Sequence, residues 1–241
     1  MSKALERVEL LLKKEGLKKL QDSCVMIIGV GGVGSYAAEA LARSGIGKLI
    51  LVDHDVVAES NLNRQVHATI KTIGQKKTTS MKERIALINP DCQVEEIASF
   101  FSAELFSSFE YRVDYVIDAI DTVSSKIDCI ELCHQLKIPC ISSLGMANRL
   151  DPTKLEVTTL AKTTYDPLAK ACRAVVKKRK IRYKIPVVFS REEPYKQNQE
   201  VNENGKTRKE RIPPASLIFV PAAAGLTCAS IVLKSLCNKK V

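Results

Sequence analysis

The sequence contains no Cys-x-x-Cys pair, although it has eight cysteines. Structural zinc sites are commonly built from such pairs, so their absence argues against zinc. The cysteines are Cys24, Cys92, Cys129, Cys133, Cys140, Cys172, Cys228 and Cys237. Several of them lie inside apolar runs, where a free thiol behaves as a small hydrophobic side chain. We therefore expect reduced thiols, as in a cytoplasmic protein.

The sequence also lacks an internal repeat, a low-complexity tract and a secretory signal. Residues 1–16 carry charges throughout and have no apolar segment of the kind that a signal peptide needs. Export is therefore not expected. Only residues 215–233 are long and apolar enough to raise the question of a membrane span. Their small residues, proline and hydroxyl groups favour a core or dimer-interface helix over membrane association, and no stable insertion is expected.

The length and composition are typical of a globular protein with a sizeable core: 241 residues, 45% hydrophobic and 27% charged. We expect a single domain over residues 1–241. It would comprise a helical arm (1–22), a nucleotide-binding core (23–148) and a C-terminal half (149–241) with a basic loop at 191–211. The formal net charge of +10 suits a polyanionic partner such as RNA.

A glycine-rich turn is the most informative motif. Residues 24–28 predict a buried strand, residues 29–34 read Gly-Val-Gly-Gly-Val-Gly, and a helical pattern follows at 36–43. Glycines allow unusual dihedral angles and a close approach of phosphate to the backbone, and the helix N-terminus favours an anion. A second apolar run, 48–52, ends in Asp53, where a Rossmann unit places its ribose-binding acid. The motif therefore predicts a bound nucleotide, in preference to glycines that serve only a tight helix–strand crossing.

Strands and helices alternate along the chain. Strands are expected at 24–28, 48–52, 92–97, 115–119, 139–142, 154–160 and 185–189, and helices at 5–20 (or a helical pair broken at Gly16), 36–43, 75–88, 103–109, 123–136, 167–179 and the C-terminus. This order predicts an α/β fold: a Rossmann-like, doubly wound, mostly parallel sheet with helices on both faces and a less regular C-terminal half. Ligands bind beyond the carboxyl ends of such strands. Gly29, Asp53, Asp118 and Asp121 follow three strands there, so we expect one shared site.

Charged residues near this edge suggest how a nucleotide would be held. Arg64 follows Asp53 closely, and a guanidinium matches phosphate oxygens without losing its proton. Lys76 and Lys77 open the next helix and add positive charge. Asp121 is a candidate ligand of Mg²⁺ held through a triphosphate, whereas Asp118 is either a ligand or a cap of the loop. The alternative for the cations is a solvated basic surface.

Other candidates carry weaker signals. Cys129 and Cys133 lie four residues apart on an expected helix, but His134 is adjacent to Cys133 and not suitably spaced for zinc. Cys172 and Cys228 are either nucleophiles or, more commonly, buried thiols. The histidines show no triad-like arrangement. Basic clusters at 177–184 and 206–211 are either contacts for a phosphate backbone or solvated surface.

Taken together and in order, these motifs resemble the ThiF/MoeB superfamily of adenylating enzymes. The motifs are GVGGVGS (29–35), VDHD (52–55), NLNRQ (61–65), GQKK (74–77), INP (88–90) and DAIDT (118–122). Five longer segments resemble the tRNA threonylcarbamoyladenosine dehydratase branch in particular. They are NRQVHA (63–68), ERIALINPDC (83–92), VIDAIDT (116–122), KIPCISSLG (137–145) and DPTKLEVTTLAKTTYDPLAK (151–170). The likeness covers nearly the whole chain and is weakest at 191–211.

The resemblance implies an ATP site with Mg²⁺. It implies Gly29, Gly31, Gly32 and Gly34 around the phosphates, Asp53 on the ribose, Arg64 and Lys77 on the triphosphate, and Asp121 beside the metal. The same motifs add Ser35, Asp55, Asn61, Asn63 and Gln65 to the nucleotide-binding residues. Arg7 matches an arginine that reaches the partner subunit's ATP site in this superfamily, which implies a homodimer. A sulfur-transfer protein is a further partner that such relatives suggest.

The implied reaction is adenylation of the threonylcarbamoyl carboxylate on tRNA, then ring closure with loss of AMP. No protein nucleophile is required in principle, because the second attack is intramolecular. Three alternatives remain: an activator of a small ubiquitin-like or sulfur-carrier protein, an NAD-dependent oxidoreductase and a tRNA-binding module without activity. The missing Cys-x-x-Cys pairs argue against the first, Arg64 with Lys77 against the second, and the glycine loop against the third.

Overall fold

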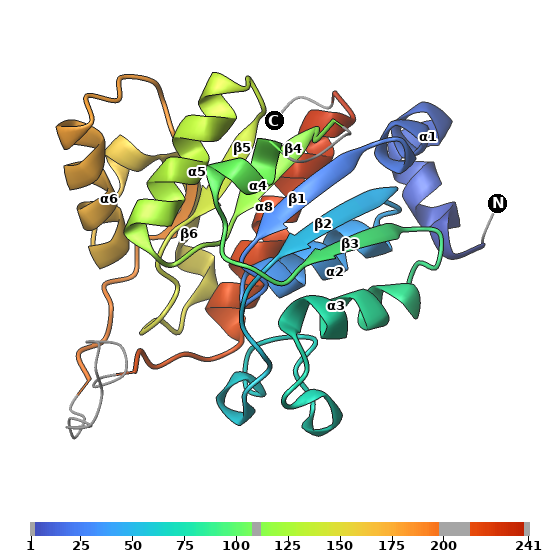
Figure 1. Ribbon diagram of the computed structural model, residues 1–241, viewed down its shortest axis with the longest axis horizontal. Helices are drawn as coiled ribbons and strands as arrows, with labels where there is room; N and C mark the ends of the chain where they lie inside the picture. Colours follow the sequence, from blue (N-terminus) through green and yellow to red (C-terminus); the bar gives the residue numbers. More distant parts are fainter. Residues whose placement is uncertain (1–2, 108–111, 198–212, 239–241) are drawn as a thin grey trace.

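The central feature is a twisted seven-stranded sheet in the order β3-β2-β1-β4-β5-β7-β6 (Figure 1). The computed structural model describes residues 3–107, 112–197 and 213–238. Its strands are β1 (Cys24–Ile28), β2 (Lys48–Val52), β3 (Gln93–Ile97), β4 (Tyr115–Asp118), β5 (Cys140–Ser143), β6 (Leu155–Thr159) and β7 (Pro186–Ser190). Every pairing is parallel except that of β6 with β7. The expected mostly parallel, Rossmann-like sheet is confirmed.

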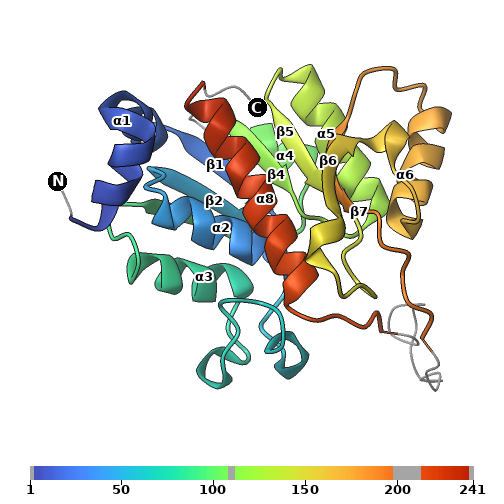
Figure 2. The ribbon, with the colours of Figure 1, turned by 180° about the vertical axis from the view of Figure 1, so that it is seen from behind.

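Helices cover both faces of the sheet, as expected (Figures 1 and 2). They are α1 (Glu6–Gln21), α2 (Gly34–Arg43), α3 (Lys77–Ala86), α4 (Ala103–Ser107), α5 (Val123–Gln135), α6 (Pro167–Lys178) and α8 (Phe219–Leu236). Short 3-10 turns lie at Lys3–Leu5, Glu59–Asn61, Ile70–Thr72, Pro152–Lys154 and Leu160–Lys162. Each expected helix and strand is found within a few residues of its predicted bounds, although residues 108–109 of one expected helix lie outside the described residues.

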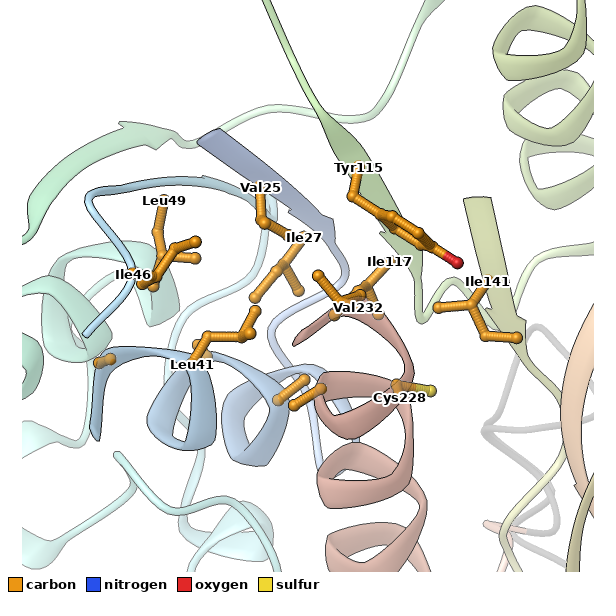
Figure 3. Packing of buried hydrophobic residues seen from close by; sticks show 14 of the residues in the cluster. Val25, Ile27, Leu41, Ile46, Leu49, Tyr115, Ile117, Ile141, Cys228 and Val232 are labelled. Atoms are coloured by element: carbon orange, nitrogen blue, oxygen red, sulfur yellow. The ribbon is translucent and has the colours of Figure 1, made fainter. Parts of the chain in front are cut away.

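The hydrophobic core has two main layers, one on each face of the sheet. Side chains of β1 alternate between them: Val25 and Ile27 pack with α2 and α8, as Figure 3 shows, whereas Met26 and Ile28 pack on the side of α4 and α5. All five residues of β1 are buried because helices cover both faces of the strand. The third cluster joins α5 and α6 to β7. The central strands are therefore packed against buried side chains on both faces of the sheet.

The strand order reverses between β1 and β4, and this position determines where a ligand can bind. β1 pairs with β2 on one side and with β4 on the other, all in parallel. The connections after β1 and β4 leave the sheet in opposite directions, to α2 and to α5 on the other face (Figures 1 and 2). A crevice forms at the carboxyl ends of such strands.

The N-terminal helix differs from expectation in where it breaks. Lys13 has φ 63° and ψ 166° and interrupts α1, whereas the predicted break was at Gly16. Gly16 is buried and helical, and a Cβ there would approach the Leu12 Cβ to 3.1 Å. Gly16 therefore allows close packing, and the helix is interrupted at Lys13. Of the expected basic loop at 191–211, only residues 191–197 are described.

Helix α8 is the apolar segment that raised the membrane question. Its 18 residues have a mean hydropathy of 1.6 and are long enough to cross a membrane. Seven of its residues are nonetheless buried within the fold, among them Gly225, Cys228 and Val232. A Cβ at Gly225 would lie 2.3 Å from the Val33 carbonyl oxygen, so the glycine allows α8 to pack directly on the start of α2. This packing agrees with the interpretation of α8 as a core helix.

Candidate functional site

A cavity of about 900 Å³ lies at the carboxyl ends of the central strands. It is lined by ten of the thirteen residues expected to bind the nucleotide: Gly29, Gly31, Gly32, Asp53, Asp55, Asn61, Arg64, Gln65, Lys77 and Asp121. These residues come from the loops after β1, β2 and β4 and from the start of α3. The expected convergence of three loops is therefore found. Gly34, Ser35 and Asn63 do not line the cavity.

Two positions of the glycine loop have no room for a side chain. Gly29 has φ 88°, and a Cβ there would lie 2.7 Å from the Ala119 carbonyl oxygen in the loop after β4. A Cβ at Gly34 would lie only 1.8 Å from the Gly29 carbonyl oxygen. Gly34 therefore lets α2 begin directly against β1, and no side chain caps the first turn of α2. Backbone N–H groups at such a helix start favour a phosphate.

Asp53 ties the end of β2 to the glycine loop. Its Oδ2 accepts a hydrogen bond from the Val30 N–H at 2.7 Å, and its Oδ1 accepts one from the Asp55 N–H at 2.9 Å. The side chain is largely buried at the cavity wall. Ser35 has a similar bracing role: its Oγ accepts a long hydrogen bond of 3.4 Å from the Val66 N–H. These contacts fix the distance between the glycine loop and the segment that carries Arg64.

Arg64 is held in place by oxygen atoms of its own loop. Its Nη1 donates to the Ser60 carbonyl at 2.7 Å and to the Asn63 Oδ1 at 2.9 Å, while Asn63 Nδ2 donates to the Ser216 carbonyl at 2.8 Å. Partial burial lowers the pKa of Arg64. No carboxylate pairs with it among the described residues. A guanidinium positioned in this way, without a negative partner, suits an anionic ligand.

Lys77 is buried at the start of α3 and forms an ion pair. Its Nζ lies 2.6 Å from Asp55 Oδ2, and its backbone N–H donates to the Asp55 carbonyl. Asp55 is half exposed and also lies 3.0 Å from the Nε2 of His54, whose ring stacks on Phe100. Acceptor atoms of Asp53, His54 and Asp55 lie within 4.8 Å of one another. Positive charge and oxygen ligands therefore face the same part of the cavity.

Two further predicted residues sit deeper in the wall. Asn61 is buried and its Oδ1 accepts from the Ala58 N–H at 3.1 Å. Gln65 is also buried, and its Oε1 finds no hydrogen-bond partner in the part of the chain that the structure describes. A buried polar atom is costly when it is unpaired, so Gln65 is suited to a polar ligand in the cavity.

The two aspartates after β4 have different surroundings. Asp118 is fully buried and accepts hydrogen bonds from Lys126 Nζ at 2.7 Å, Ser142 Oγ at 2.6 Å and the Ile120 N–H at 3.0 Å. Burial raises the pKa of Asp118, and the Lys126 ammonium opposes this effect. These contacts favour the capping role for Asp118. Asp121 is exposed on the cavity wall, where a carboxylate can reach a cation held by phosphates.

Three functional candidates did not emerge from the sequence. Lys126 is fully buried, and a lysine among apolar positions of its helix was the available signal. Arg149 and Asp166 are buried in the second half of the cavity: Arg149 donates to the Gly145 carbonyl, and Asp166 accepts from the Gly145 N–H at 3.0 Å. Asp166 also caps α6, a role indicated by the following proline. The cavity therefore extends well beyond the glycine loop.

The remaining candidates lie outside the cavity. Arg7 is exposed on α1, the helix that precedes β1, and it does not line the cavity. Burial raises the pKa of the Cys172 thiol to about 11 and that of Cys228 to about 12, so neither is an activated nucleophile. His67 is buried, and burial, with Lys77 and Arg84 nearby, lowers its pKa to about 4. No Ser-His-Asp or Cys-His arrangement lies within the described ranges near the cavity.

Comparison with known proteins places this geometry in a family. Residues 4–241 match the model of the ThiF family. The chain is 46% identical over 236 residues to the tRNA threonylcarbamoyladenosine dehydratase of Bacillus subtilis, covering 95% of this chain and 93% of that protein. It is 36% identical over 138 residues to the sulfur carrier protein ThiS adenylyltransferase of Escherichia coli, and this match covers 56% of this chain and 55% of that protein.

The fold matches a solved structure of the same kind. The crystal structure of E. coli tRNA N6-threonylcarbamoyladenosine dehydratase, TcdA, in complex with ATP superposes with a TM-score of 0.85. The two sequences are 35% identical, and the match covers 98% of this chain and 94% of that one. Family model, sequence relatives and fold agree with the resemblance found in the motifs. The chain belongs to the ThiF family and, within it, to the branch of the tRNA threonylcarbamoyladenosine dehydratases.

Proposed function

We propose that this protein is an ATP-dependent tRNA threonylcarbamoyladenosine dehydratase and that residues 1–241 act as one domain. The observation that carries the proposal is a single cavity in which the glycine loop, Arg64 and Lys77 meet at one end. The other end is lined by Arg149 and Asp166 and leaves room for a second substrate beside a nucleotide. The likeness to the B. subtilis dehydratase over 95% of the chain supports the same activity.

In the first step, the threonylcarbamoyl carboxylate attacks the α-phosphorus of ATP and pyrophosphate leaves. The glycine loop and the start of α2 receive the phosphates, while Asp53 faces the ribose. Arg64 and Lys77 face the triphosphate, where their positive charges oppose the negative charge that grows on the leaving pyrophosphate. Lys77 exchanges its contact with Asp55 for a phosphate oxygen. The product of this step is an acyl adenylate.

In the second step, a neighbouring group of the same modified nucleoside attacks the activated acyl carbon. The attacking group releases its proton to solvent, the carbon–oxygen bond to AMP breaks, AMP departs with that oxygen, and a ring closes; the net change in the nucleoside is the loss of one water. Because the attack is intramolecular, its effective concentration is high and no protein nucleophile is needed. The buried, inert thiols of Cys172 and Cys228 agree with this route.

Mg²⁺ fits the oxygen atoms available at this end of the cavity. Asp121 lies on the wall, and its carboxylate together with phosphate oxygens forms the type of ligand set that Mg²⁺ prefers. The ion would neutralise charge on the triphosphate. The chain's own contribution is to present Asp121 from the short loop between β4 and α5. No zinc is required for either step.

Asp121→Asn is therefore expected to lower turnover by about 10²-fold even at saturating ATP, because the amide keeps the shape but loses the charge. The measurement is single-turnover cyclisation at several Mg²⁺ concentrations. Asp91→Asn, at an exposed aspartate that precedes β3 and does not line the cavity, serves as the matched control. Unchanged activity in Asp121→Asn would remove this residue from the site.

The tRNA and a second protomer complete the proposed assembly. Lysines on and after α6, including Lys177, Lys178 and Lys180, are exposed and available to a phosphate backbone, whereas Arg179 is paired with Asp128 and Glu131. Residues 206–211 of the second basic cluster lie outside the described residues. We place the reaction in the cytoplasm and retain a sulfur-transfer protein as a candidate partner.

A homodimer would bring Arg7 of one protomer to the cavity of the other. Arg7→Ala and Arg64→Ala are each expected to lose nearly all of the activity when tested alone. Mixed after dissociation and reassociation, they are expected to regain roughly a quarter of the activity per site, because half of the dimers are hybrid and each hybrid has one intact site. The measurement is turnover against mixing ratio. A mixture as inactive as its components would contradict sharing.

The direct test of the activity uses the purified protein, Mg²⁺, ATP and tRNA carrying uncyclised threonylcarbamoyladenosine. Nucleoside mass spectrometry is expected to show loss of one water, and pyrophosphate is expected to appear only with ATP. A parallel reaction with a small sulfur-carrier protein tests the alternative suggested by the likeness to the ThiS adenylyltransferase. Pyrophosphate exchange with the carrier and an unchanged nucleoside would assign the protein to that alternative.

A further inference from the structure

Three cysteines meet at a place remote from the nucleotide cavity. Cys129 and Cys133 lie one turn apart on α5 and face β5, where Cys140 is the first residue. The three Sγ atoms all lie within 4.8 Å of one another. The turn between helix and strand is closed by the Ile138 N–H, which donates to the Cys133 carbonyl at 2.9 Å. The thiols are therefore brought together by the α5–β5 connection itself.

The cysteine cluster lies at the amino end of β5, whereas the nucleotide cavity lies at the carboxyl end of the same strand. Cys140 begins β5, whereas Ser143, which lines the large cavity, ends it. A second cavity of about 250 Å³ opens beside Cys133 and Cys140 and is lined also by His134 and Tyr183. The Tyr183 hydroxyl is buried and has no hydrogen-bond partner within the described ranges. An unpaired polar atom beside clustered thiols points to a missing ligand.

The chemistry of the cluster favours a cation. Three cysteine sulfurs that lie within 4.8 Å of one another form a ligand set for a soft cation, because thiolates bind such ions strongly. A bound metal ion would replace the thiol protons and contact all three sulfurs. Tetrahedral zinc with zinc–sulfur bonds of about 2.3 Å places its sulfur ligands about 3.8 Å apart, which small side-chain adjustments achieve here.

We propose that Cys129, Cys133 and Cys140 bind one thiophilic d¹⁰ cation of the Zn²⁺ class, with the fourth coordination position facing the second cavity. His134 is held away from the metal position, because its ring stacks on Tyr183 with centroids 3.5 Å apart. The expectation of no zinc was based on the spacing of Cys129, Cys133 and His134 in the sequence. The fold brings Cys140 beside the two other cysteines, which their spacing does not reveal. The site would clamp the end of α5 to the start of β5.

Metal titration of the full-length protein tests the proposal without an activity assay. After treatment with a chelator under reducing conditions, one equivalent of Cd²⁺ is expected to produce thiolate-to-metal absorption. Cys133→Ala is expected to weaken Cd²⁺ affinity by at least about 100-fold, whereas Cys172→Ala, another buried cysteine, is expected to bind as the parent does. Absence of the absorption, or its survival in Cys133→Ala, would overturn the proposal.

Differential alkylation of the native parent protein tests the same site without a substitution, so its result does not depend on whether Cys133→Ala folds. Trypsin separates Cys129 and Cys133 (residues 127–137) from Cys140 (residues 138–149). Cd²⁺ is expected to slow alkylation in both peptides by about tenfold or more and to leave the peptide of Cys228 unchanged. Unprotected thiols, or two peptides joined by a disulfide in the protein as isolated, would each contradict a metal site.

Discussion

Replacing Arg64 with alanine is expected to lower ATP-dependent cyclisation by about 10²–10³-fold while the fold stays intact. The guanidinium is positioned before any ligand binds, since the Ser60 carbonyl and Asn63 Oδ1 hold its Nη1. It is partly buried and has no carboxylate partner in the described part of the chain, so the substitution leaves no unpaired charge behind. The measurements are single-turnover cyclisation and the melting temperature.

Arg64→Lys separates charge from geometry. Lysine keeps the positive charge but presents a single ammonium in place of the planar fork, so an intermediate activity is expected. Arg43→Ala is the matched control, because Arg43 lies on the surface and forms an ion pair with Glu39 across one helical turn. Normal turnover in Arg64→Ala would place the triphosphate elsewhere in the cavity.

The fold was predictable because its signals are local. Buried strands such as residues 24–28 and 48–52 are short apolar runs, and the glycine turn between the first strand and its helix requires conformations that few other residues allow. The antiparallel pairing of β6 with β7 was not predictable in the same way. Its register matches Leu155 with Ser190, and nothing in either segment encodes the partner.

The residues of the candidate site also fall into two groups: those predictable from local sequence and those that depend on contacts between distant segments. Residues that follow the ends of strands, such as Gly29, Asp53 and Asp121, were expected to converge because parallel strands share one edge. The surroundings of Lys126, Arg149 and Cys140 emerged only with the structure. Lys126 on α5 meets Asp118 of β4, Arg149 meets carbonyls that follow β5 and precede α6, and Cys140 of β5 meets two cysteines of α5. A buried lysine in particular looks like an ordinary surface residue until the strand beside it is known.

Lys126→Met is expected to lower the free energy of unfolding by about 3–5 kcal/mol, the largest effect on stability that we predict. Lys126 Nζ is fully buried and contacts Asp118 Oδ2, Ser142 Oγ at 3.0 Å and the Ser143 carbonyl at 2.9 Å. Methionine fills similar space but leaves the Asp118 carboxylate buried without a counter-charge. Chemical denaturation at pH 8 measures the change, with Lys18→Met, from an exposed ion pair with Asp22, as the control.

The sign of the pH dependence shows whether an uncompensated carboxylate is the cause. Burial already raises the pKa of Asp118, and removal of the ammonium removes the main opposing influence. In the folded Lys126→Met variant, Asp118 keeps its proton at pH values at which an aspartate in the unfolded chain, with a pKa of about 3.9, has released it. The folded state then binds more protons than the unfolded state, so the free energy of unfolding falls as pH rises. The deficit relative to the parent is therefore expected to be smaller at pH 5 than at pH 8.

Asp118→Asn in the same background is expected to restore part of the stability, because no buried charge remains. A deficit that is equal at both pH values and unaffected by Asp118→Asn would mean that lost packing around Lys126, and not its charge, supports the junction of β4, β5 and α5.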